Sequence, residues 1–285
     1  MPPTGGDKPS SSYRRGVFFP MLNNNLNTQG KTRVLTPHPC STVDDPTRFL
    51  IHGSMPEEQQ LITEQVNSPI DQPRLLLWRY SQPAVIMGCS QRPDPKQLQR
   101  AAQRNLPIIR RGSGGGAVLA GPWMLSLSFF IPITHPLAEL DLIKIFGWFE
   151  QVWLQALQQS GIDSRGVDKA LIDHSKQVAK EQQVDWACYA ALSHGEIVSP
   201  DGRKLVGLAQ IRKRHCIALV SGLHLQPCDW KILSEVVVDD PTRGAVLESL
   251  NADAEQLGAA PAAQFLGPLL NHFCRALPTE TELLQ

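Results

Sequence analysis

Apolar positions follow two different periods along the chain, and the change of period separates predicted helices from predicted strands. From residue 142 to 157 apolar residues recur every three to four positions, which predicts a helix with one buried face, ended near Gly161. Residues 124–131 are apolar and carry Ser126 and Ser128 at alternate positions. That alternation predicts a half-buried strand.

Caps, turns and shorter apolar runs predict the remaining elements. Ser54 and Asp94 are suited to cap helices, because each precedes a proline within two residues and a helical pattern. The predicted helices cover residues 56–66, 94–104 and 261–277, and the predicted strands cover 74–80, 84–88, 106–109, 117–119 and parts of 187–225. Strands in hairpins with helices between them favour an α+β fold with a largely antiparallel sheet over a doubly wound parallel one.

The start of the chain differs from the rest in composition. Residues 1–30 are rich in Pro, Gly, Ser and Asn without periodicity, so they cannot bury enough surface to offset the entropy of ordering. We expect a flexible N-terminal arm over residues 1–30. Residues 31–285 are expected to form one domain, with no separate domain at its C-terminal end.

Charge and cysteine content narrow the classes of function. The chain has 285 residues, and 27 Lys and Arg balance 27 Asp and Glu, so no overall field attracts nucleic acid or an anionic membrane. No run approaches the ~18 apolar residues of a membrane helix, and the N-terminus lacks a signal-peptide pattern. We expect a cytoplasmic protein with reduced thiols and no metal site. The six scattered cysteines are Cys40, Cys89, Cys188, Cys216, Cys228 and Cys274.

A glycine-rich stretch is the most unusual part of the sequence. Residues 110–117 read RRGSGGGA, in which bare backbone can approach a ligand closely while the guanidinium of Arg111 binds a carboxylate or phosphate. A tightly bent surface turn is the alternative. The spacing matches the GxGxxA dinucleotide pattern, but an alternating strand follows where that pattern requires a helix. The candidate ligand-binding residues are Arg111, Ser113, Gly114, Gly115, Gly116 and Ala117.

Two further candidates follow in the second half of the chain. Lys204 enters an apolar strand that contains Gly207 and Ala209, where an ammonium would bind an acyl carbonyl or phosphate in an environment poor in water. A solvent-facing hairpin lysine is the alternative. Cys188 stands beside aromatic residues and can accept an acyl group as a thioester, or serve as a small buried hydrophobe.

Together these stretches resemble the lipoate-protein ligase and octanoyl (lipoyl) transferase family, which is related to biotin-protein ligases. The similar segments are residues 78–91 (WRYSQPAVIMGCSQ), 110–118 (RRGSGGGAV) and 202–212 (GRKLVGLAQIR). The resemblance implies a class II biotin/lipoate ligase-like catalytic domain. It also implies that the glycine-rich turn lines an acyl pocket and that Lys204 stabilises the developing oxyanion as the lysine of a carrier domain attacks. Val85 and Val118 are expected walls for an eight-carbon chain.

The segment Ala187-Cys188-Tyr189 is similar to that of the cysteine-dependent octanoyltransferases. The resemblance therefore implies transfer of an octanoyl or lipoyl group to a lipoyl carrier domain through Cys188, with a lipoyl carrier or acyl carrier protein as partner. An ATP-dependent ligase that forms lipoyl-adenylate, with ATP and Mg²⁺, is the alternative. A biotin-protein ligase and a non-catalytic module that binds the acyl group or its carrier are also retained.

Overall fold

The computed structural model describes residues 38–285, so the arm predicted at residues 1–30 lies outside the described residues. Within the described chain, nine strands form a large sheet. In spatial order they are β1 (His38–Pro39), β12 (Glu282–Leu283), β3 (Arg74–Tyr80), β7 (Met124–Pro132), β11 (Cys216–His224), β10 (Lys204–Arg212), β9 (Ile197–Val198) and β8 (Arg165–Gly166), with β2 (Leu50–Gly53) also beside β3. All neighbours are antiparallel except β12 and β2, which run parallel to β3. The predicted α+β class with a mostly antiparallel sheet is confirmed.

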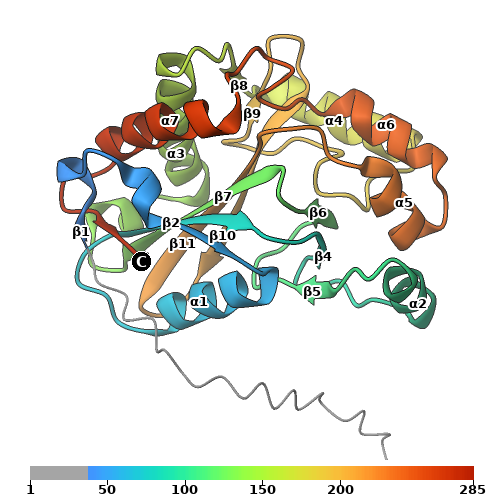
Figure 1. The fold of residues 1–285 in the computed structure, drawn as a ribbon, viewed down its shortest axis with the longest axis horizontal. Helices are drawn as coiled ribbons and strands as arrows, with labels where there is room; N and C mark the ends of the chain where they lie inside the picture. Colours follow the sequence, from blue (N-terminus) through green and yellow to red (C-terminus); the bar gives the residue numbers. More distant parts are fainter. Residues whose placement is uncertain (1–37) are drawn as a thin grey trace, which may run out of the picture. The chain divides into compact units, whose positions relative to one another are not determined.

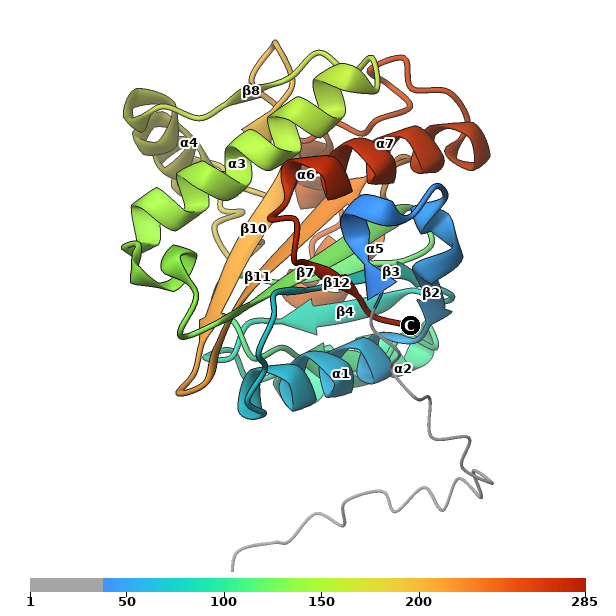
Figure 2. The same ribbon diagram turned by 90° about the vertical axis from the view of Figure 1, so that its left-hand side faces the viewer.

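Helices cover both faces of the large sheet, with α3 and α7 on one side and α1 on the other (Figures 1 and 2). The α-helices are α1 (Met55–Asn67), α2 (Pro95–Gln103), α3 (Leu142–Gln159), α4 (Lys169–Glu181), α5 (Trp230–Val238), α6 (Thr242–Leu250) and α7 (Ala262–Ala276). Short 3₁₀ helices are η1 (Cys40–Thr42), η2 (Pro46–Phe49) and η3 (Pro136–Glu139). The helices α1, α2, α3 and α7 occur where the sequence predicts them, whereas α4, α5 and α6 were not predicted.

Strand alternation divides the core into two layers. In β3, Leu75 and Leu77 pack with α3 and α7, whereas Leu76 and Trp78 face the side of α1. The same alternation applies to β7, whose nine residues are all buried, so the prediction of a half-buried strand is wrong. Its serines face the α1 side, where Ser126 lines a pocket. The polar positions in β7 therefore mark a binding face of the sheet.

A second, small sheet lies beside the large one. It consists of β5 (Ile108–Arg110), β4 (Ala84–Met87) and β6 (Val118–Ala120), with β4 in the centre. Although β4 begins soon after β3 ends, the two strands belong to different sheets, because β4 pairs with β5 and β6 instead. The glycine-rich turn connects β5 to β6, as the sequence predicts. This connection brings the turn close to the α1 side of the large sheet.

Cys40 and Cys274 form a disulfide, which contradicts the expectation that all thiols are reduced. The two residues are 234 positions apart in the sequence, and they meet because η1 packs against α7. Scattered spacing cannot reveal such a pair, since only the tertiary fold brings the cysteines together. Cys89, Cys188, Cys216 and Cys228 are free.

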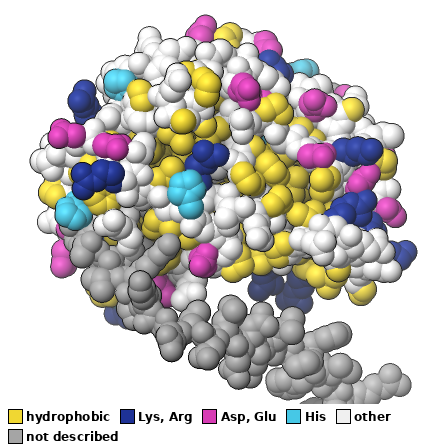
Figure 3. Space-filling view, in the orientation of Figure 1, with side chains coloured by type: hydrophobic (Ala, Val, Ile, Leu, Met, Phe, Trp, Pro, Cys, Tyr) yellow, Lys and Arg dark blue, Asp and Glu magenta, His cyan; other side chains and the backbone are white. Residues whose placement is uncertain are grey.

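Charges of both signs are interspersed on the face shown in Figure 3, and hydrophobic side chains gather to the right of its centre. This mixture agrees with the balanced charge of the sequence. No helix within residues 38–285 has the length and apolar character needed to cross a bilayer.

Candidate functional site

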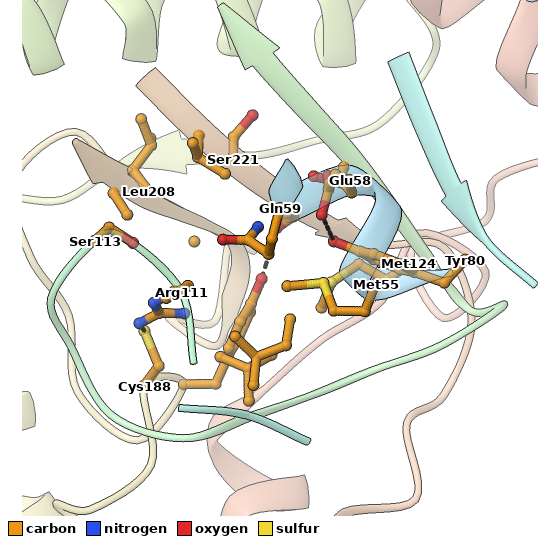
Figure 4. Close-up of a pocket in the computed structure, with 18 residues that line it drawn as sticks. Met55, Glu58, Gln59, Tyr80, Arg111, Ser113, Met124, Cys188, Leu208 and Ser221 are labelled. Atoms are coloured by element: carbon orange, nitrogen blue, oxygen red, sulfur yellow. Dashed lines mark hydrogen bonds between the residues drawn. The ribbon is translucent and has the colours of Figure 1, made fainter. Parts of the chain in front are cut away.

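A pocket lies between α1, the small sheet, the glycine-rich turn and the strands β7, β10 and β11 (Figure 4). The space between its walls is about 500 Å³, including the part open to solvent. Most of its wall is apolar. The lining residues are Met55, Glu58, Gln59, Tyr80, Ile86, Arg111, Ser113, Val118, Met124, Ser126, Cys188, Tyr189, Gly207, Leu208, Ala209, Val220, Ser221 and Gly222.

One end of the pocket holds a thiol and a guanidinium. Nη2 of Arg111 lies 3.5 Å from Sγ of Cys188 and donates to it. The same side chain folds over the glycine-rich turn, since Nη2 donates to the carbonyl of Gly114 at 2.7 Å and to that of Gly116 at 3.3 Å. Arg111 is therefore held in place by the turn, and its positive charge rests beside the sulfur.

Two positions of the glycine-rich turn require glycine. Gly115 has a φ of +101°, and an added Cβ would lie 2.5 Å from Nη2 of Arg111 and 3.4 Å from Sγ of Cys188. At Gly116 an added Cβ would lie 2.4 Å from the carbonyl oxygen of Trp186. The turn therefore permits a close approach between the backbone, the guanidinium and the segment that carries Cys188.

Ala117 ties this turn to the Cys188 segment by two backbone hydrogen bonds. Its N–H donates to the carbonyl of Trp186 at 2.8 Å, and its carbonyl accepts from the N–H of Cys188 at 2.9 Å. The two segments thus form a short parallel bridge. Although 70 residues separate them in the sequence, the turn and the thiol are fixed to each other.

Lys204 is buried rather than solvent-facing, with 2% of its side chain exposed. Its Nζ lies 2.6 Å from Oε1 of Glu196, whose side chain is also 2% exposed, and donates to the carbonyls of Cys188 at 2.9 Å and Ala191 at 3.1 Å. Burial raises the pKa of Glu196, and the charge of Lys204 opposes that rise. The ammonium of Lys204 therefore binds the carbonyl of Cys188 directly, while its charge is balanced by a carboxylate that is equally buried.

Tyr189 separates Lys204 from the pocket. Its ring lines the pocket and lies 4.8 Å from Nζ of Lys204, and its hydroxyl donates to the carbonyl of Gly222 at 2.7 Å. A second hollow lies on the other side of this ring. That hollow is lined by Lys204 with Arg165, His174 and Arg203, among others. Lys204 thus lines the second hollow, and the ring of Tyr189 lies between its ammonium and the pocket.

The other end of the pocket holds a buried carboxyl. Glu58 on α1 is 1% exposed, and its Oε2 accepts from the hydroxyl of Tyr80 at 2.7 Å. Burial raises the pKa of Glu58, and the neighbouring polar side chains of Ser126, Tyr80 and Gln59 oppose the rise. Burial also raises the pKa of Tyr80 well above its ordinary value. This carboxyl is therefore shifted towards its neutral form.

The structure brings part of the predicted site together around one pocket. The predicted residues that line it are Arg111, Ser113, Cys188, Gly207 and Ala209; those that do not are Gly114, Gly115, Gly116, Ala117 and Lys204. Of the two predicted walls, Val118 lines the pocket, while Val85 points into the core and its neighbour Ile86 lines the pocket instead.

Sequence reasoning missed Glu58, Tyr80 and Glu196 as residues of the site. An acidic residue in the first turn of a helix is ordinary, so Glu58 carried no signal of its own. Glu196 follows Gly195 in a turn and meets Lys204 only after β9 and β10 pair. His194 and His215, which also lie near Cys188 in the sequence, line neither the pocket nor the second hollow.

The family model of the lipoyl protein ligase A/B catalytic domain matches residues 57–257, which is most of the chain. The chain belongs to this family. No curated protein sequence matches it. Members of the lipoyl protein ligase family are enzymes, and so is this protein.

Solved structures share the fold of this family member at low sequence identity. Lipoate-protein ligase A bound with ATP is 16% identical, with a TM-score of 0.60 over 80% of this chain and 83% of the other. A Thermoplasma acidophilum protein with bound lipoic acid is 16% identical, with a TM-score of 0.59 over 80% and 83%. A bipartite lipoate protein ligase from T. acidophilum, described with its E2 lipoyl domain, is 18% identical, with a TM-score of 0.59 over 80% and 81%.

The pocket of this lipoyl protein ligase family member is lined mostly by apolar side chains, with the thiol of Cys188 at one end and the carboxyl of Glu58 at the other. Within residues 38–285 there is no group of three or more His, Cys, Asp and Glu residues that could hold a metal ion. Mg²⁺ that accompanied ATP would be held largely by the phosphates of the nucleotide.

Proposed function

We propose that the protein transfers an octanoyl or lipoyl group to the acceptor lysine of a lipoyl carrier domain, through a thioester on Cys188. The observation that carries this proposal is the position of Cys188 at one end of an apolar pocket, with Nη2 of Arg111 3.5 Å from its sulfur. Burial of each CH₂ of an acyl chain contributes about 0.8 kcal/mol to binding. The pocket therefore supplies affinity, and the thiol supplies a nucleophile.

The reaction consists of two acyl transfers. In the first, the thiolate of Cys188 attacks the carbonyl carbon of an acyl thioester on a carrier protein, and the thiol of that carrier leaves with the proton that Cys188 gave up. In the second, the uncharged amine of the acceptor lysine attacks the Cys188 thioester. An amide forms, and the proton lost by the amine returns to the sulfur of Cys188. Arg111 stabilises the negative charge on the sulfur when it attacks and when it leaves.

Lys204 has a positioning role in this conformation, because its Nζ binds the carbonyl of Cys188. The family resemblance implies a catalytic role instead, in which the ammonium of Lys204 stabilises the oxyanion formed at the acyl carbonyl. For that contact the side chain must turn from Glu196 past Tyr189 into the pocket. Both roles predict that Lys204→Ala abolishes modification of the carrier domain, and activity above about a tenth of the wild-type rate would remove Lys204 from the mechanism.

ATP-dependent ligation is the second candidate, and the second hollow favours it. Lys204, Arg165 and Arg203 line this hollow together with Asp201, which pairs with Arg203, and cations in such a hollow suit the phosphates of a nucleotide. In that reaction the acyl carboxylate attacks the α-phosphorus of ATP and pyrophosphate leaves. The acceptor lysine then displaces AMP from the acyl-adenylate, so Cys188 is not required.

Intact-mass analysis of a lipoyl domain distinguishes the two candidates. The full chain is mixed with the domain and either octanoyl-carrier protein or free lipoate, each with and without ATP. We expect modification from the thioester donor without ATP, and a hydroxylamine-labile adduct on Cys188. Cys188→Ala should abolish both, whereas Cys89→Ala, which removes an exposed free thiol, should not.

Other outcomes assign other functions. Turnover that survives Cys188→Ala and requires ATP would establish ligation. Modification by free biotin in place of lipoate would indicate a biotin-protein ligase. Binding of the acyl group or the carrier without modification of either would indicate a non-catalytic module.

A further inference from the structure

A buried carboxyl oxygen in the acyl pocket has no partner. Oε2 of Glu58 accepts from Tyr80, but Oε1 is buried and has no hydrogen-bond partner among residues 38–285. Buried polar atoms are nearly always paired, since an unpaired one keeps the full cost of its lost hydration. Because Glu58 also lines the pocket, a ligand in the pocket is the natural partner for this oxygen.

Glu58 lies at the end of the pocket remote from the reactive thiol. Figure 4 shows Glu58 and Tyr80 on one side of the pocket, and Cys188 and Arg111 on the other. Apolar residues of the small sheet and of β10 and β11 form the walls, namely Ile86, Val118, Leu208 and Val220. An acyl chain with its carbonyl at Cys188 therefore extends along these walls towards Glu58.

Two methionines surround the same end. Met55 lies one helical turn before Glu58 on α1, and Met124 begins β7. Both are labelled beside Tyr80 in Figure 4. Thioether side chains are polarisable and adapt to irregular shapes, so they pack well against a sulfur-containing ring. The remote end of the pocket thus combines an unpaired carboxyl oxygen with two sulfur atoms.

We infer that Glu58 is a specificity-determining residue that selects a lipoyl group, with a dithiolane at its remote end, over a plain octanoyl chain. This inference rests on the proposed function and adds the choice of acyl group to it. A methyl terminus would cover Oε1 and leave it unpaired, whereas a dithiolane sulfur can accept a hydrogen bond from the carboxyl O–H. Burial raises the pKa of Glu58 and so favours the neutral form that carries this O–H.

The test compares lipoate and octanoate, both as free acids that bind the full chain in calorimetry and as thioester donors in the transfer assay. We expect wild-type protein to prefer the lipoyl compound about tenfold in both measurements. Glu58→Leu should reduce this preference to about one while octanoate binds at least as tightly as before. Glu58→Gln, which keeps an N–H donor, should retain most of the preference.

Control variants separate selection from general damage. Glu64→Leu makes the same change at an exposed position of α1 and should leave the preference unchanged. Tyr80→Phe removes the hydroxyl that orients Glu58 and should lower the preference, which provides a second reading if Glu58→Leu does not fold. Octanoate binding by each variant reports that the pocket is intact.

Failure of the inference is distinguishable from failure of the proposed function. If wild-type protein transfers or binds both acyl groups equally, or if Glu58→Leu leaves a tenfold preference intact, the role of Glu58 is overturned while acyl transfer through Cys188 stands. If no donor acylates Cys188 but lipoate still binds more tightly than octanoate and Glu58→Leu abolishes the difference, the transfer proposal fails and the role of Glu58 in recognition stands.

Discussion

At the scale of single residues, Lys204 and Glu196 form an ion pair in which both side chains are 2% exposed. Removal of one partner leaves the other charge buried without compensation, which typically costs about 3–5 kcal/mol. We therefore expect Lys204→Met and Glu196→Leu each to lower the free energy of unfolding by about that amount. Urea denaturation of both variants measures the loss.

The double variant tests whether the two residues act as a pair. Because it removes both charges at once, it should be less destabilised than the sum of the single variants by at least about 1 kcal/mol. Strict additivity would show that the contact contributes nothing specific to folding, and that each residue acts through other neighbours.

His224 predicts a pH dependence of stability. It is buried between the rings of Tyr189 and Trp230, at centroid distances of 4.5 and 5.1 Å, and burial lowers its pKa to about 3, assisted by the charge of Lys204. The unfolded chain binds a proton at this residue below about pH 6.5, whereas the folded chain does not until about pH 3. The contribution of the buried, neutral His224 to the free energy of unfolding is therefore complete above pH 6.5 and is lost as the pH falls towards 3.

Protonation of His224 in the unfolded chain should lower the free energy of unfolding by about 2 kcal/mol between pH 6.5 and pH 5, at about 1.4 kcal/mol per pH unit. His224→Phe keeps an aromatic ring and cannot titrate. Chemical denaturation at the two pH values should show a smaller loss for the variant than for the wild type. Equal losses in both proteins would assign the acid sensitivity to other groups.

The sequence predicts those site residues that stand out by residue type. Arg111 is found because four glycines in five positions are unusual, and Cys188 is found because its segment resembles that of the cysteine-dependent octanoyltransferases. Glu58 and Glu196 are not found, because burial of an acidic residue is decided by packing between distant segments. In each case the partner, Tyr80 or Lys204, lies on another element.

At the scale of elements, the glycine-rich turn depends on its backbone conformation. Gly115→Ala places a Cβ at a φ of +101° and against Nη2 of Arg111, so it should displace the guanidinium and lower the rate of acyl transfer at least tenfold. Gly114→Ala is the matched control, because an added Cβ there meets no atom within 4 Å. Single-turnover acylation of Cys188 measures both, and equal rates would contradict the proposed role of the turn.

Element types follow from the sequence more readily than their pairing. Capping by Ser54 and Asp94 and the apolar period of α3 locate three helices. The run of valines in α5 favours a strand locally, and tertiary packing overrides this preference. The local sequence also does not predict which sheet β4 joins, because a short turn after β3 is compatible with a hairpin as well as with a change of sheet.

At the scale of the whole molecule, the disulfide joins the beginning of the described chain to its last helix. Closing a loop between Cys40 and Cys274, 234 residues apart, reduces the entropy of the unfolded chain by an amount worth up to about 5 kcal/mol. We expect reductant to lower the Tm by several degrees. Cys40→Ser should have this lower Tm already and should not respond to reductant, whereas Cys216→Ser should respond like the wild type.

The periodicity of apolar residues predicts the fold class of the molecule, because fold class depends on the types and order of the helices and strands, which local patterns indicate. They do not predict that residues at the two ends of the described chain share one sheet. There β12 lies between β1 and β3, so the end of the described chain pairs with its first strand. Such closure depends on contacts between remote segments, which single-sequence patterns do not encode.

The bridge at Ala117 has a mechanical consequence for catalysis. Since Ala117 binds the backbone on both sides of Ala187, a displacement of the glycine-rich turn must carry the sulfur of Cys188 with it, or break two hydrogen bonds. The guanidinium of Arg111 and the sulfur of Cys188 are therefore coupled through the backbone. A donor that displaces the glycine-rich turn is expected to move both groups together, so that the distance between the charge and the sulfur changes little.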